Sequence, residues 1–352
     1  MGHDPAPVIT GFGTSKTGVA RQLSSHAKAS RLAVKVNEFG KLRVDSELLC
    51  ECDDGEDWRD EARNPGARDL ALNAGLPEID GQILSQADSF EALLSSDTET
   101  RADIFGYWPV ADRVAFVGRL TRSWMRLRTK PVGERRVALI FQNSPIRLGG
   151  IGNGVGFNMP ALAIAILQAL ERTGYRIADA PRDSKTLVHR LLAGPTTSNP
   201  TAAAEETLSF ADYSIFFTAL PAAVQATVTA SWGPGERDPF YRPGRLDCGR
   251  FAIPGFRAGN VAVLIQSVPA HNIGPKSAPQ DYRLAPPHAY FATYAWLAED
   301  FRADAAIHLG RRGTLEGSPG ASLTLAAECF PDAILSQLPH FYPFIVNDRG
   351  EY

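Results

Sequence analysis

The sequence predicts an α/β protein with a mostly parallel sheet and helices on both faces, preceded by a less regular N-terminal region. Beyond residue 131, short apolar runs alternate with segments of helical periodicity, which is typical of parallel strands joined by helices. Before residue 131, an acidic stretch at residues 50–60 and a polar stretch at 95–101 are typical of exposed loops. We therefore expect an N-terminal portion, 1–131, that ends in a closing helix, and an α/β domain, 132–352.

The closing helix is predicted from Asp112 to Arg128, where apolar residues recur at helical spacing before Pro131 breaks the pattern. A strand is then expected over 136–142, followed by a glycine-rich loop and a helix that begins near Asn158. Pro160 suits the first turn of that helix. This order predicts one βα unit.

Further elements follow in the same alternating order. We expect a strand at 175–180, a long helix at 211–232 and a strand at 260–266. A helix starting at His288 and a strand at 305–309 come next, and Gly310 ends that strand. Ligands of open α/β sheets bind beyond the carboxyl ends of the strands, so the residues after 309 are expected to belong to a site.

Composition excludes several classes of protein. The chain has 352 residues, 44% of them hydrophobic and 21% charged, and a formal net charge of -3, so it offers no basic surface for nucleic acid. No apolar run approaches the roughly 20 residues of a membrane span, and the first residues do not resemble a secretion signal. We expect a cytoplasmic protein. Its four cysteines are too few for a disulfide framework in a chain of this length and fit reduced thiols.

Two glycine-containing segments invite a nucleotide-binding interpretation. GFGTSKTG, at residues 11–18, has the wrong spacing for a phosphate loop, so we do not expect this chain to bind ATP. The loop at 149–156 has Gly-x-Gly-x-Gly rather than Gly-x-Gly-x-x-Gly spacing. It could hold an anion at the start of the following helix or form a tight turn, and both alternatives stay open.

Two acidic segments of the N-terminal portion carry possible chemistry. Cys50 and Cys52 lie beside acidic residues and could bind a soft metal, although a surface hairpin is the favoured alternative because no second ligand pair follows. Glu78 and Asp80 would face one side of a strand, or Asp80 would bond the backbone in a turn.

His308 and Glu316 are the strongest candidates for catalysis, because a neutral imidazole can bind a divalent metal and both groups can accept a proton. Arg311 and Arg312 lie between them. His288 could join the site, but the start of a helix explains it more simply.

Three long strings resemble the large-subunit family of cobaltochelatase and, more distantly, of magnesium chelatase. They are RRVALIFQNSPIRLGGIGNGVGFNMPALAIAILQALERTGY at 135–175, LPEIDGQI at 76–83 and AECFPDAILSQLPHFYPFIVND at 327–348. The strings occur in family order. The resemblance also extends through the segment around His308.

The resemblance implies a protein that holds a corrin-type tetrapyrrole, hydrogenobyrinic acid a,c-diamide, while Co²⁺ is inserted during cobalamin biosynthesis. Cobalt is then a substrate, and ATP is hydrolysed by separate AAA+ and metal-adhesion-type subunits of a multisubunit complex. His308 and Glu316 match the first His and the Glu of the family's His-x-Gly-x-His-Gly-x-x-Glu, which makes them the expected catalytic residues and metal ligands.

The expected tetrapyrrole contacts include Glu78 and Asp80, which match the family's other acidic element. To these we add His288, Arg312 and Asn153, the last of which lies in the glycine-rich loop.

The sequence also departs from the family pattern. Arg312 replaces the second His and cannot act as a neutral imidazole. Ala321 replaces a lysine, Gln82 an arginine, and the motif at 266–272 is altered. Because the family's proteins continue beyond both ends of this sequence, the chain is expected to be a central fragment or a truncated, diverged relative. Two alternatives to a catalytic cobaltochelatase subunit remain: a non-catalytic tetrapyrrole- or metal-binding fragment, and a large subunit of the magnesium type.

Overall fold

The computed structural model describes nine stretches of the chain, and the account of the structure concerns these: 9–12, 83–87, 89–97, 102–142, 153–154, 157–244, 248–266, 285–310 and 328–341. The chain divides into two compact units. One is Met1–Met125 with Gly320–Cys329, and the other is Arg126–Pro319 with Phe330–Tyr352. No helix in the described stretches is long and apolar enough to cross a membrane.

The first unit contains two pairs of strands and most of one long helix. Strands β1 (Ile9–Phe12) and β2 (Ile83–Ala87) pair in parallel, and β3 (Ser89–Asp97) and β4 (Ala102–Pro109) form an antiparallel hairpin. The polar stretch expected as a loop at 95–101 is therefore partly strand. Helix α4 (Ala111–Thr129) confirms the predicted closing helix and buries Val114 and Val117.

The second unit is built on a five-stranded sheet with the order β11-β12-β5-β13-β14. Strands β12, β5, β13 and β14 run parallel, and only the edge strand β11 is antiparallel to its neighbour. The strands are β5 (Val137–Phe141), β11 (Gly255–Ala258), β12 (Val261–Ile265), β13 (Ala305–Leu309) and β14 (His340–Phe341). The mostly parallel sheet that the sequence predicts is confirmed.

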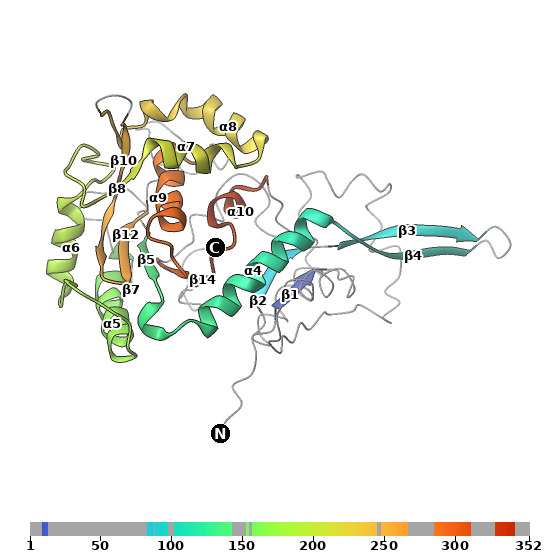
Figure 1. Ribbon diagram of the computed structural model, residues 1–352, viewed down its shortest axis with the longest axis horizontal. Helices are drawn as coiled ribbons and strands as arrows, with labels where there is room; N and C mark the ends of the chain where they lie inside the picture. Colours follow the sequence, from blue (N-terminus) through green and yellow to red (C-terminus); the bar gives the residue numbers. More distant parts are fainter. Residues whose placement is uncertain are drawn as a thin grey trace, which may run out of the picture. The chain divides into compact units, whose positions relative to one another are not determined.

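Helices cover both faces of this sheet, as predicted. Figure 1 shows α5 and α6 on one side of the strands and α7 and α9 on the other. The alternate side chains of β5 divide between two hydrophobic cores, because successive residues of a strand point to opposite faces. The helices are α5 (Met159–Arg172), α6 (Ser184–Ala193), α7 (Phe210–Thr218), α8 (Ala222–Trp232), α9 (His288–Glu299) and α10 (Phe330–Leu335).

Smaller elements complete the second unit. A three-stranded antiparallel sheet has the order β8-β10-β9, and β6 pairs with β7. These strands are β6 (Asn153–Gly154), β7 (Phe157–Asn158), β8 (Glu206–Ser209), β9 (Tyr241–Arg242) and β10 (Arg250–Ile253), and the short 3-10 helices are η4 (Val132–Glu134) and η5 (Gly235–Arg237).

Local capping explains where two of the helices begin. The side chain of Asn158 accepts a hydrogen bond from the backbone N–H of Ala161 at 3.0 Å, and Pro160 occupies the first turn of α5. Asp183 caps α6 in the same way through Thr186 at 2.9 Å. The predicted start of a helix near Asn158 is therefore confirmed.

Two predicted elements are wrong. The long helix expected at 211–232 is divided into α7 and α8, because Pro221 lies between them and cannot continue a helix. The strand expected at 175–180 is absent. Its Arg176 carbonyl accepts one hydrogen bond, from the backbone N–H of Asn260, and Asp179 takes a positive φ of 55° that ends any extended run.

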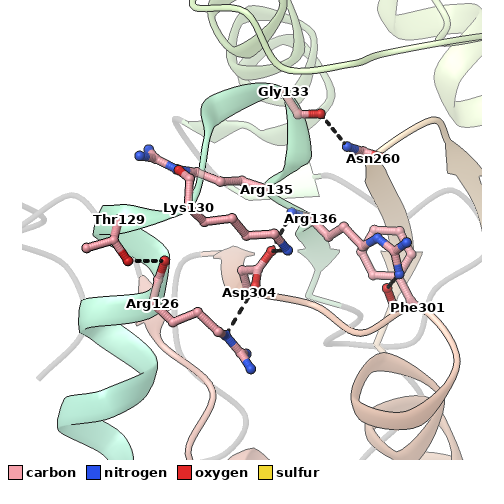
Figure 2. Close-up of polar contacts among 9 residues, drawn as sticks. All are labelled: Arg126, Thr129, Lys130, Gly133, Arg135, Arg136, Asn260, Phe301 and Asp304. Carbon is pink, nitrogen blue, oxygen red and sulfur yellow. Dashed lines mark hydrogen bonds and ion pairs between the residues drawn. The ribbon is translucent and has the colours of Figure 1, made fainter. Parts of the chain in front are cut away.

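The amino ends of the strands are held by the carboxylate of Asp304, which lies just before β13 (Figure 2). Its Oδ2 accepts from the backbone N–H of Arg136 at 2.8 Å and from Nζ of Lys130 at 2.6 Å. Arg126 adds a longer ion pair of 3.5 Å. This group ties the end of α4 and the segment before β5 to the start of β13, so we interpret it as a structural anchor.

Candidate functional site

The carboxyl edge of the parallel sheet is the place where the candidate segments leave the core. The backbone N–H of Gln142, just after β5, donates to Leu309 at 2.8 Å, and that of Gln266, just after β12, donates to Phe141 at 2.8 Å. These bonds hold the three strand ends in register. The glycine-rich loop, the altered motif at 266–272 and the segment containing Glu316 therefore follow three neighbouring strand ends in the sequence.

Gly310 allows the backbone to pass close to its neighbour at this edge. A Cβ atom at Gly310 would lie 2.5 Å from the Cβ atom of Gln142, which cannot move aside as the amide end of that side chain can. The glycine that ends the predicted strand is thus required by the packing of the two strand ends.

His308 lies one residue before the end of β13, on the sheet face that packs against α9. Only 6% of the residue is exposed. Its Nε2 lies 2.9 Å from the hydroxyl of Tyr294 and 3.5 Å from the amide nitrogen of Gln266. Its Nδ1 contacts Nε2 of His340, the first residue of β14. Both ring nitrogens of His308 are therefore engaged within the protein.

Gln266 links this histidine to a second tyrosine. Its amide nitrogen donates to the hydroxyl of Tyr290 and lies 3.2 Å from that of Tyr294. The two tyrosine rings stack one helical turn apart on α9, with centroids separated by 5.4 Å. The result is a continuous polar chain, Tyr290–Gln266–Tyr294–His308–His340, which we call the edge chain; it is buried except at His340, which is partly buried.

Burial keeps the imidazoles of the edge chain neutral. Loss of solvation, with a smaller contribution from His340, holds the pKa of His308 well below its ordinary value. Burial likewise lowers the pKa of His340 to about 4 and raises the pKa of Tyr294 well above its ordinary value. At neutral pH the chain therefore contains two uncharged imidazoles and a protonated phenol. Such imidazoles can accept a proton or bind a metal once a ring nitrogen is released.

Metal ligands are sparse in the described stretches. They contain no group of three or more His, Cys, Asp or Glu side chains that could together hold a metal ion. His308 and His340 supply two nitrogens at most. A site for a divalent ion would need oxygen ligands from other residues, and Glu316 is the residue expected from the sequence to supply one.

His288 has a different environment. Its Nδ1 contacts the hydroxyl of Tyr213, and its Nε2 lies 2.9 Å from the carbonyl oxygen of Gly233. Because a carbonyl only accepts, Nε2 carries the proton and Nδ1 accepts from the tyrosine. The structure thus gives His288 two structural partners at the start of α9, and its expected contact with a tetrapyrrole stays a prediction.

Most of the other predicted site residues lie outside the described stretches. This holds for Glu78, Asp80, Arg312 and Glu316, as it does for Cys50 and Cys52. The backbone of Asn153 is described and pairs with Asn158 between β6 and β7, and both interpretations of the glycine-rich loop stay predictions. The expected substrate contact of Asn153 remains a prediction.

Sequence reasoning misses most of the edge chain. Periodicity places Tyr290 and Tyr294 on an apolar helix face, Gln266 falls in an altered motif, and His340 receives no role. The available signal is the order of elements, which places Gln266 and His308 at the ends of parallel strands. His340 has no such signal, because its two-residue strand is too short to predict.

A family model and several known proteins are similar to this chain. The family model described as CobN/Magnesium Chelatase matches residues 14–352. The chain belongs to this family. It is 39% identical to the aerobic cobaltochelatase subunit CobN of Sinorhizobium sp over 343 residues, 97% of this chain and 26% of the relative. The CobN subunit of Pseudomonas aeruginosa is also 39% identical, over 87% of this chain and 24% of the relative.

A more distant relative and a solved structure belong to the same kinds of chelatase. A magnesium-chelatase subunit of Chlorobaculum parvum is 26% identical over 85% of this chain and 22% of that protein. The catalytic subunit of cobaltochelatase from Mycobacterium tuberculosis has a similar structure, with a TM-score of 0.68 and 34% identity over 80% of this chain and 23% of that one. The chain thus spans about a quarter of the length of the relatives it matches.

Proposed function

We propose that this chain is part of the large subunit of a cobaltochelatase and inserts Co²⁺ into hydrogenobyrinic acid a,c-diamide, a step in cobalamin biosynthesis. Membership of the CobN/Magnesium Chelatase family supports a chelatase role. The choice of cobalt rests on the 39% identity to two CobN subunits, against 26% to a magnesium-chelatase subunit.

One observation carries the proposal for the site. Three neighbouring parallel strands end together, and a neutral imidazole, His308, lies at that edge. The segments that follow these strands contain the glycine-rich loop and Glu316. This is the edge at which open α/β sheets bind ligands.

The chemistry of insertion suits these residue types. Co²⁺ must lose water ligands, and the inner N–H proton of the corrin must be removed as the ring nitrogens bind the metal. In the proposal, His308 and Glu316 accept this proton or ligate the incoming ion, since an imidazole and a carboxylate can do either. Glu78, Asp80, His288, Arg312 and Asn153 contact the tetrapyrrole and its polar substituents.

ATP hydrolysis is assigned to partner subunits. The GFGTSKTG segment lacks phosphate-loop spacing, so this chain supplies no nucleotide site in the proposal. An AAA+ ATPase and a metal-adhesion-type subunit then drive insertion, in the cytoplasm.

Reconstitution tests the proposal. The chain is combined with the two partner subunits, ATP, Co²⁺ and hydrogenobyrinic acid a,c-diamide, and insertion is followed by the absorption spectrum of the corrin. We expect Glu316→Gln and His308→Gln to lower turnover by about 100-fold or more, the usual contribution of a positioned acid or base. Glu328→Gln, at an exposed carboxylate, is the matched control and should leave turnover unchanged. Equal turnover in all four chains would reject the assignment.

A second candidate function is a tetrapyrrole-binding module without catalysis. Two observations favour it: both nitrogens of His308 already have partners, and Arg312 replaces an imidazole. Quenching of tryptophan fluorescence by the corrin distinguishes the candidates. Binding without turnover supports the module, binding with Co²⁺ insertion supports the chelatase, and absence of binding at high micromolar corrin rejects both. Insertion of Mg²⁺ into a porphyrin in place of Co²⁺ would indicate a subunit of the magnesium type.

A further inference from the structure

We propose that His340 is a positioning residue for His308, holding its proton on Nδ1 so that Nε2 is the nitrogen with the free lone pair. The inference rests on the proposed function in one respect, since it takes His308 as the imidazole that meets the substrate.

The two histidines are placed together by strand pairing. Strands β13 and β14 are parallel, with Ala306 opposite His340, so His340 lies on the sheet face shared by Ala306 and His308. Their rings meet edge to face, with centroids 4.6 Å apart and an interplanar angle of 79°. In this arrangement Nδ1 of His308 points at Nε2 of His340.

The partners of Nε2 decide which nitrogen carries the proton. The amide nitrogen of Gln266 directs its two hydrogens to the hydroxyls of Tyr290 and Tyr294, so the Tyr294 hydroxyl accepts from Gln266 and directs its own proton to Nε2 of His308, 2.9 Å away. Nε2 of His308 is therefore an acceptor. The proton of the neutral ring lies on Nδ1, and Nε2 of His340 accepts it.

A simple packing role does not require these donors and acceptors. An apolar ring at position 340 would fill the same space but would leave the Nδ1–H of His308 buried without an acceptor, and a buried unpaired donor is unfavourable. Burial and the lowered pKa values agree with an uncharged pair in which one ring donates to the other.

The consequence concerns the reacting nitrogen. A histidine whose Nδ1–H is held by an acceptor has a fixed ring orientation and a fixed direction for the lone pair of Nε2. In the edge chain this lone pair is covered only by the hydroxyl of Tyr294 and the amide of Gln266. The inner N–H proton of the corrin or a metal ion reaches it by displacing the tyrosine hydroxyl. His340 thus supplies a second imidazole next to His308 in a sequence whose position 312 has arginine in place of the family's second histidine.

Nuclear magnetic resonance of the isolated chain tests the proton position directly. Two-bond ¹H–¹⁵N correlations of histidine-labelled protein distinguish a ring protonated on Nδ1 from one protonated on Nε2. We expect Nδ1–H at His308 in the wild type. The same state should persist in His340→Gln, whose side-chain oxygen still accepts, and in the distant control His189→Gln. In His340→Phe, His308 should shift to Nε2–H, donating to Tyr294. An Nε2–H wild type, or an unchanged Nδ1–H state in His340→Phe, overturns the proposal.

Turnover in the reconstituted system tests the consequence. His340→Phe should lower kcat by about 10- to 100-fold, the usual effect of losing the partner of an active imidazole, with KM for the corrin changed less than about twofold. His340→Gln should recover most of the loss. Full activity of His340→Phe, or equal losses in both variants, overturns the positioning role. If the wild type inserts no Co²⁺, the proposed function is rejected instead. The NMR measurement of the proton position on His308 still tests the positioning role of His340 in that case.

Discussion

Both ring nitrogens of His308 have partners within the protein, so neither is available to a substrate until a contact breaks. An imidazole beneath a helix cannot meet a macrocycle until a partner moves, so Tyr294 controls access to Nε2. The hydroxyl of Tyr294 therefore has two roles, one in stability and one in access.

The stability role predicts a modest loss in Tyr294→Phe. Removing the hydroxyl leaves Nε2 of His308 with only the distant amide of Gln266, and a lost intramolecular hydrogen bond lowers the free energy of unfolding by about 1 kcal/mol. Urea denaturation measures this difference. Tyr175→Phe is the matched control, because Tyr175 is partly buried against the opposite core and no hydrogen bond to its hydroxyl is found in the described structure. Equal losses in the two variants would show that the Tyr294–His308 bond contributes nothing specific.

Sequence reasoning at this scale identifies His308 but not its partners. Histidine before a strand-ending glycine is visible in the sequence, and its place at the carboxyl edge follows from the predicted strand. Gln266, Tyr294 and His340 come from three other elements, so their convergence depends on strand order and register. Neither can be read from local periodicity.

At the scale of elements, α9 is buried all around from His288 to Leu297. Pro287 precedes the helix without a capping side chain, and the carboxylate of Asp238 instead accepts the backbone N–H of Ala289 at 2.8 Å. The indole of Trp232 donates to the carbonyl of Ala285 at 2.8 Å just before the helix. The start of α9 is thus fixed from the region between α8 and β9, and His288 belongs to this attachment.

His288→Phe tests that interpretation. The phenyl ring keeps the volume but removes the bonds to Tyr213 and Gly233, leaving buried polar groups unpaired, so we expect a loss of about 2 to 3 kcal/mol in the free energy of unfolding. Thermal or urea unfolding measures it. His189→Phe, on α6 and away from this network, should change stability by less than about 0.5 kcal/mol. A stable His288→Phe chain that has lost affinity for the corrin would instead support the tetrapyrrole contact.

The anchor at the amino edge makes a separate prediction (Figure 2). Asp304→Asn removes the charge that pairs with Lys130 and accepts the backbone N–H of Arg136, at a side chain only 3% exposed, so we expect stability to fall by about 2 to 3 kcal/mol. Asp300→Asn is the control. The side chain of Asp300 is 47% exposed, so its ion pair with Arg257 should contribute less than about 1 kcal/mol. Turnover per folded molecule should be unchanged in both, because this edge lies opposite the candidate site.

Elements were predictable where pattern and capping agreed. Helix α4, strand β5 and helix α5 follow from periodicity, from Pro131 and from Asn158 with Pro160. The single helix expected at 211–232 failed because the apolar pattern continues through Pro221, where the backbone cannot. The strand expected at 175–180 has strand-like alternation, but it finds only one backbone bond to its neighbour.

At the scale of the whole molecule, the imidazoles of the buried His308 and the partly buried His340 predict sensitivity to acid. Burial lowers the pKa of His340 to about 4 and that of His308 well below its ordinary value, whereas both titrate near 6.5 when unfolded. Below pH 6.5 the unfolded chain therefore binds protons that the folded chain does not. The free energy of unfolding should fall as the pH drops from about 6.5 to about 4, with His340 contributing on the order of 3 kcal/mol.

Urea denaturation at pH 7 and at pH 4.5 measures this effect. The difference between the two pH values should be smaller in His340→Phe than in the wild type. Burial raises the pKa of Asp238, which acts in the opposite sense, but that carboxyl is present in both chains and cancels in the comparison. An identical pH dependence in the two chains would mean that the histidine pair does not set acid stability.

The central claim is that the carboxyl edge of the parallel sheet receives the tetrapyrrole. Hydrogen–deuterium exchange of the chain, measured with and without hydrogenobyrinic acid a,c-diamide, tests it most directly. We predict slower exchange in peptides from 143–152, 267–284 and 311–327, which follow β5, β12 and β13, and unchanged exchange in 130–136 at the opposite edge. Protection confined to the amino edge or to the N-terminal unit, with these three segments unaffected by bound corrin, would contradict the account.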